Sequence, residues 1–218
     1  LRTRALASLA LAASGSPAEG EQVLRETALL PEAEERSVKA DISKHLLLTK
    51  LFAKDYAGAV PVADQAIADA RLARLPFHEA VALHNFGDVL HRLGRYADSR
   101  AALRASQELT ETHQFEALLR GNRSHLRYLD GLEGDAQAVL ALEHEIAEAE
   151  ARGALGDAVD LRCLIARVFH KDGQRERAVI EYEAVLRLSS STGQKLAHEE
   201  AEHALAQLQH QLAERREG

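Results

Sequence analysis

A turn signal recurs along this chain of 218 residues at nearly constant spacing. The clearest copy lies at Gly94, where one apolar helical pattern ends and a second begins. Related turns follow at steps of 39 or 40 residues, at Gly15, Lys54, Gly134 and Gly173. A period of about 20 to 50 residues is the signature of a solenoid, in which each unit buries its apolar face only against its neighbours. The sequence therefore predicts a stack of helical hairpins.

Composition supports an all-α fold class. Ala, Leu, Glu and Arg dominate, aromatic residues make up 4%, and the four prolines lie where helices could begin. We predict one continuous array over residues 1–218, with repeats at 1–30, 31–75, 76–113, 114–153 and 154–193. Residues 189–193 are expected to end the regular pattern, and residues 194–216 form a capping helix, because a terminal unit needs a polar outer face.

Two helix starts carry recognisable capping residues. Ser16, Pro17 and Glu19 match a capping box with Pro at the first helical position. In such a box the Ser hydroxyl and the Glu carboxylate bond amide hydrogens that otherwise lack partners. Asp55 is expected to cap the second helix of repeat two in a similar way.

Residues 82–109 resemble a tetratricopeptide repeat (TPR). The residues that carry the resemblance are Phe86, Gly87 and Leu90 in the first helix, Gly94 and Tyr96 at the turn, and Ser99 and Leu103 in the second helix. The sequence of this segment is most similar to the longer repeats, about 40 residues each, of kinesin-light-chain-type proteins and of bacterial regulatory proteins. The resemblance implies a right-handed α-α superhelix of about five hairpins plus the cap, with a concave groove that binds a protein or peptide. Repeat four departs from the pattern at Arg123 and Arg127.

The resemblance also implies ligand-facing positions on the first helix of repeat three, at His84, Asn85, Asp88, His91 and Arg92. A solvated polar face with no ligand is the alternative. His84, Asp88 and His91 are of metal-ligand type at i, i+4 and i+7, but no fourth ligand is visible. We therefore predict no metal and no cofactor.

Arg120, Arg123 and Arg127 form a stripe at i, i+3 and i+7, with Tyr128 beside it. Aligned guanidinium groups can clamp a carboxylate or phosphate in forked hydrogen bonds, or they can pair with the glutamates of the following helix. Repeat five has a similar cationic side, formed by Arg162, Arg167, His170 and Lys171. If both sides face inward, the groove suits an acidic peptide or a free C-terminus.

Charge and cysteine content limit the partners and the cellular compartments that suit this chain. The net charge of −7 gives no basic footprint for nucleic acid, and no apolar run is long enough to span a membrane. The single cysteine, Cys163, excludes an internal disulfide and favours a reducing, cytoplasmic compartment. Residues 1–13 could be a signal peptide, but they fall in phase with the period, so we expect a helix. The absence of Met, with Leu1 first, suggests a fragment of a longer protein.

The sequence thus predicts a scaffold or regulatory module that binds a protein or peptide, within a larger bacterial signalling protein. The alternative is a region that senses a small molecule or nucleic acid and controls an attached kinase, ATPase or DNA-binding domain. An enzyme is not expected, because no nucleophile, base and pocket can be assembled from the sequence.

Overall fold

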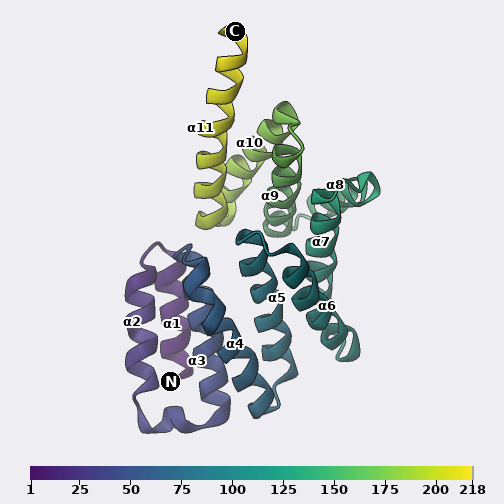
Figure 1. Ribbon diagram of the computed structural model, residues 1–218. Coiled ribbons are helices and arrows are strands. Elements are labelled where there is room, and N and C mark those ends of the chain that lie inside the picture. The colour runs from purple at the N-terminus through teal and green to yellow at the C-terminus, as the bar shows by residue number, and fades with distance from the viewer. Residues whose placement is uncertain (218) are drawn as a thin grey trace. The chain divides into compact units, whose positions relative to one another are not determined.

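The chain folds into consecutive antiparallel helical hairpins (Figure 1). The structure, a computed structural model, describes residues 1–217, with side chains described for residues 1–211. Every regular element in the described residues is helical, which confirms the all-α class. The elements are α1 (Arg2–Ala13), α2 (Pro17–Ala28), η1 (Pro31–Glu34), α3 (Arg36–Phe52), α4 (Tyr56–Ala73), α5 (Pro76–Arg92), α6 (Tyr96–Thr112), α7 (Glu116–Leu132), α8 (Ala136–Ala151), α9 (Leu155–Lys171), α10 (Arg175–Thr192) and α11 (Lys195–Glu217).

The helices form two compact units, and the boundary between them along the chain falls within α7. The first unit is Leu1–Arg123, and the second begins at Ser124. The expected helix at residues 1–13 is α1, which packs on α2 and α3 within the first unit. The single continuous array and its right-handed superhelical course remain predictions, because each unit is defined separately. No helix in the described residues is long and apolar enough to cross a membrane.

From α3 to α10 each helix is followed by a residue with left-handed backbone conformation. These residues are Lys54, Arg74, Gly94, Gln114, Gly134, Gly153, Gly173 and Gly193. At Gly94 the φ angle is +75°, and the turn is closed by amide bonds from Arg95 to the Leu90 carbonyl (2.9 Å) and from Gly94 to the His91 carbonyl (2.9 Å). This is a Schellman motif, which satisfies the carbonyls that a helix leaves unpaired at its end. The turn predicted from the 40-residue period is thus the end of an α-helix at a residue with left-handed backbone conformation.

Small residues allow α5 and α6 to approach closely. A Cβ atom on Gly87 would lie 2.7 Å from Cγ of the buried Leu103, so only glycine fits there without movement. The Ser99 hydroxyl donates a 2.7 Å hydrogen bond to the Gly87 carbonyl across the same contact. The close packing of this hairpin therefore depends on three of the residues that carry the TPR resemblance.

One core cluster of the first unit lies between α3, α4 and α5, and another joins α1, α2, η1 and α3. The first of these clusters combines fully buried alanines such as Ala59 and Ala63 with the larger side chains of Leu47, Ile67 and Leu83. In the second unit Cys163 is buried in α9.

Two local expectations need correction. At Ser16 the helix begins as expected, but the Ser side chain makes no capping hydrogen bond, so the capping box is not formed. The serine-rich run at 189–192 does not interrupt the helix, because α10 continues to Thr192 and stops at Gly193. The Ser190 hydroxyl donates to the Leu186 carbonyl (2.9 Å), the local bonding that lets a serine remain inside a helix. Asp55 does cap α4, accepting a 3.0 Å bond from the Gly58 amide.

Candidate functional site

One face of α5 carries a polar cluster held by a residue of α4. Arg92 donates from Nη1 to the Tyr56 hydroxyl at 3.0 Å, and its guanidinium lies 5.3 Å from the centre of the Tyr56 ring. Its Nε lies 3.3 Å from both carboxylate oxygens of Asp88, one turn earlier on α5. Asn85 is half-buried on the same face. We call Asn85, Asp88 and Arg92 the α5 polar face; it presents an amide, a carboxylate and an oriented guanidinium.

His84 belongs to a buried hydrogen-bonded chain. Its Nδ1 lies 2.8 Å from Oδ1 of Asn122 in α7, and Nδ2 of Asn122 donates to the Ser106 hydroxyl at 2.9 Å. Ser106 in turn donates to the Ala80 carbonyl at 2.8 Å. Burial lowers the pKa of His84 despite the opposing effect of its bond to Asn122, so the ring is neutral near pH 7. This chain ties α5, α6 and α7 together within the first unit.

His91 is also inside the packing. It is 5% exposed, and its Nδ1 lies 3.5 Å from the Asp88 carboxylate. A side chain so covered cannot contact a ligand on the surface, so His91 leaves the set of groove positions. In the described residues no group of three or more His, Cys, Asp or Glu side chains is arranged to hold a metal ion.

The arginine stripe of α7 pairs with glutamates of both neighbouring helices. In the first unit Arg123 lies 3.4 Å from Glu111 of α6, and both side chains are about half exposed. In the second unit Arg127 pairs with Glu145 of α8, which also accepts a 2.7 Å bond from Ser124. An exposed pair such as Arg123–Glu111 contributes about 0 to 1 kcal/mol, so a ligand carboxylate could replace Glu111.

Arg167 and Tyr128 serve packing in the second unit. Arg167 makes a forked ion pair with Glu200 of α11, with Nε–Oε1 and Nη2–Oε2 distances of 2.6 and 2.7 Å. Burial alone would lower the pKa of this guanidinium, but the Glu200 carboxylate raises it well above its ordinary value. Tyr128 is 4% exposed. The expectation that these two residues line a groove is therefore not supported by where they lie: Arg167 is occupied by α11 and Tyr128 is covered.

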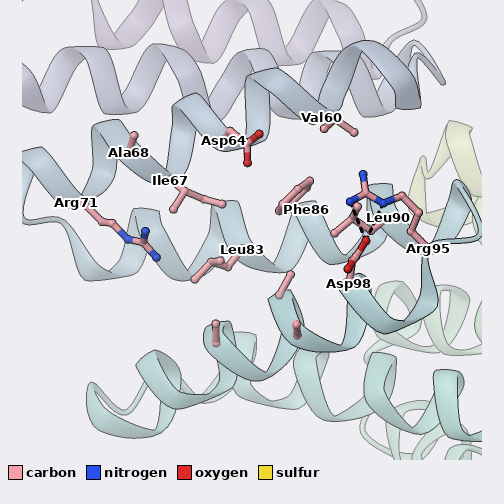
Figure 2. A pocket seen from close by; sticks show the side chains of 13 residues that line it. Val60, Asp64, Ile67, Ala68, Arg71, Leu83, Phe86, Leu90, Arg95 and Asp98 are labelled. Atoms are coloured by element: carbon pink, nitrogen blue, oxygen red, sulfur yellow. Dashed lines mark hydrogen bonds and ion pairs between the residues drawn. The ribbon is translucent and has the colours of Figure 1, made fainter.

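A second concave site lies between α4 and α6 and was not foreseen from the sequence (Figure 2). It has a volume of about 550 Å³ and a floor formed by Leu83, Phe86 and Leu90 of α5. We call it the α4–α6 groove. The walls are Val60, Asp64, Ile67, Ala68 and Arg71 on α4, and Arg95, Asp98, Ala101, Ala102 and Ala105 on α6. Its only sequence signal is a run of short side chains on α6 at positions where larger residues would fill the space.

Comparison with known proteins agrees with the fold of consecutive helical hairpins. The family model for the tetratricopeptide repeat matches residues 80–113 and 159–192. A crystal structure of nearly identical TPR-like repeats, from a Podosopora anserina protein assigned as a kinesin light chain, has 17% sequence identity with this chain. The superposition covers 88% of this chain and 95% of that one, with a TM-score of 0.59, and shows a shared fold. No curated protein matches the chain.

Proposed function

We propose that this chain binds a protein or peptide partner. Residues 80–113 and 159–192 match the family model for the tetratricopeptide repeat, a repeat that generally builds protein-interaction scaffolds and is typically non-catalytic. The proposed contact surface is the α5 polar face, with Arg123 of α7 as a further cation in the same unit. The partner is an acidic segment or a free C-terminus. Groove recognition of this kind needs no bond-making step.

The observation that supports this proposal most directly is the fixed position of Arg92. A flexible arginine loses side-chain entropy when it binds, at a cost of about 0.5 to 1.5 kcal/mol. Here the Tyr56 hydroxyl and the Asp88 carboxylate already hold the guanidinium, and the side chain keeps 17% of its surface exposed. A guanidinium so oriented can donate hydrogen bonds to the carboxylate of a ligand with little further loss of side-chain freedom.

The wider setting is part of the same proposal. The resemblance to bacterial regulatory repeats supports a role in a larger bacterial signalling protein, and the single buried Cys163 supports a cytoplasmic location. Sensing of a small molecule or nucleic acid for an attached output domain is the alternative, and its distinguishing feature would be binding that needs no peptide.

Selection of peptides on the intact chain tests the proposal. A random peptide library is displayed in two forms, as internal segments and as segments with a free C-terminus. Binders to the wild-type protein are selected, and their affinities are measured by calorimetry. We expect the selected peptides to carry a carboxylate, and Arg92→Ala to weaken their binding by about 10- to 100-fold, since a charge-assisted hydrogen bond contributes about 1.5 to 3 kcal/mol.

Arg104→Ala is the matched control, because Arg104 is exposed on α6 and lies outside the α5 polar face. Its binding should equal that of the wild type. Tyr56→Phe, which keeps the ring but removes the hydroxyl that fixes Arg92, should give an intermediate loss. Peptides that bind wild type and Arg92→Ala equally, with both proteins folded by circular dichroism, would contradict the proposed surface.

A further inference from the structure

The α4–α6 groove lies on the other side of α5 from the polar face. At about 100° per residue, Leu83, Phe86 and Leu90 occupy one side of α5, while Asp88 and Arg92 occupy nearly the opposite side. The groove is therefore a separate surface, and its occupancy does not compete directly with a ligand of the α5 polar face.

The shape of the groove matches a helix. The groove runs along about two turns of α5, roughly 10 Å, and Phe86 is the partly exposed side chain of its floor, because Leu83 and Leu90 are only 7% and 1% exposed. The α6 wall is formed largely by Ala101, Ala102 and Ala105, whose short side chains let a helix backbone come near. A volume of about 550 Å³ falls within the range of concave binding sites, about 300 to 1,000 Å³.

An extended peptide fits the groove less well than a helix does. Its backbone amides and carbonyls would enter a site lined mainly by alkyl and phenyl groups, where unpaired polar groups are costly. A helix bonds these groups internally and presents only side chains, as in other complexes that place an amphipathic helix in an apolar groove.

Charge identifies the residue type that should flank the apolar contacts. The carboxylate of Asp64 points into the groove from α4 (Figure 2), and among the described side chains no cation pairs with it. The other charges at the groove are neutralised locally. Arg71 pairs with Glu79 at 2.6 Å, and Arg95 pairs with Asp98 at 2.7 Å at the opposite end. One uncompensated negative charge thus borders an apolar floor.

We propose that the α4–α6 groove binds a short amphipathic α-helix from a partner protein. Apolar side chains of that helix contact Phe86, Val60 and Ala105, and a Lys or Arg on its flank pairs with Asp64. This surface and its ligand are independent of the acidic ligand of the α5 polar face. A chain with both surfaces can hold two partners of opposite charge preference at once.

Two helical peptides test the proposal. Both are alanine-based and fluorescently labelled, with Leu at i, i+3 and i+7; one carries Lys and the other Glu at the flanking position. They are titrated into the intact chain and binding is followed by fluorescence anisotropy. We expect the Lys peptide to bind about fivefold more tightly than the Glu peptide, and Asp64→Lys to reverse that preference.

Ala101→Gln provides a steric test that spares the core, because Ala101 is exposed and lines the groove. It should weaken both helical peptides about tenfold or more while leaving the melting temperature and the ligands of the α5 polar face unchanged. Arg92→Ala should do the reverse, so that failure of one surface is distinguishable from failure of the other.

Three results would overturn the inference. The first is equal binding of the Lys and Glu peptides to the wild type. The second is a preference that Asp64→Lys leaves intact. The third is self-association of the unliganded chain that Ala101→Gln abolishes, since the occupant would then be a second copy.

Discussion

Single atoms at the α5–α6 contact decide whether the hairpin closes. Gly87→Ala places a methyl group 2.7 Å from Leu103, which is buried and cannot move freely. Overpacking of this kind costs about 1 to 3 kcal/mol, more than the gain of up to about 1 kcal/mol from the better helix propensity of alanine. We expect a lower melting temperature and a lower urea midpoint.

Gly121→Ala is the control at a glycine within α7. There the nearest atom to a new Cβ is His84 Cε1 at 3.4 Å, an ordinary contact. This variant should gain up to about 1 kcal/mol from helix propensity. If both substitutions shift stability in the same direction, the close approach at Gly87 is not the cause of its requirement for glycine.

Two buried histidines make stability depend on pH. Burial lowers the pKa of His84, and likewise of His45, whose Nδ1 bonds the Asp41 carbonyl, below the ordinary value of 6.5. Below about pH 6.5 the unfolded chain takes up protons that the folded chain resists, so unfolding becomes easier as pH falls. Their contribution is complete above that pH and is lost as pH falls towards the folded pKa values.

The melting temperature should therefore decrease from about pH 7.5 to about pH 5.5, where most carboxylates are still ionised. His84→Asn retains a donor for Asn122 but cannot titrate, so its curve should be flatter than that of the wild type. A variant curve parallel to the wild-type curve would show that His84 does not contribute to the slope.

Among the elements, α11 is attached to α9 by one strong ion pair. Glu200→Ala leaves Arg167 without its forked partner in a site where the arginine is 17% exposed. Loss of one member of a fully buried pair costs about 3 to 5 kcal/mol, and partial exposure here reduces the expected loss to about 1 to 3 kcal/mol. Chemical denaturation of the intact chain measures it.

The neighbouring pair Lys195–Glu199 supplies a control on the same helix. Its atoms are 3.9 Å apart and both side chains are more than 40% exposed. Glu199→Ala should change stability by less than about 0.5 kcal/mol. Similar losses in the two variants would mean that helix propensity, and not the Arg167–Glu200 pair, dominates.

At the scale of the whole molecule, the sequence pattern predicted the helical hairpins and their order along the chain. The period of 40 residues located five hairpin turns, and four of them have a glycine, the residue best suited to a left-handed backbone conformation at a helix end. The intervening stops at Arg74 and Gln114 have no glycine, with φ angles of 55° and 58°, so composition did not reveal that they share the same geometry.

The site predictions depend on side-chain environments that distant helices set, and sequence patterns do not report these environments. Arg167 had the appearance of a groove residue, but its partner Glu200 lies 33 positions later, on a helix whose packing face could not be oriented from sequence. Tyr128 and His91 were placed on the surface for a similar reason. The α4–α6 groove was missed because it depends on what three helices leave unfilled, and periodicity reports only which positions are apolar.

The packing of each helix on its neighbours in the chain has a consequence for folding kinetics. The main packing of every helix within each unit is with helices one or two places away in the chain, so few contacts close long loops. Low contact order of this kind is associated with fast folding, and a nucleus can form in any hairpin and propagate to its neighbours. Folding can thus start from more than one hairpin in the chain.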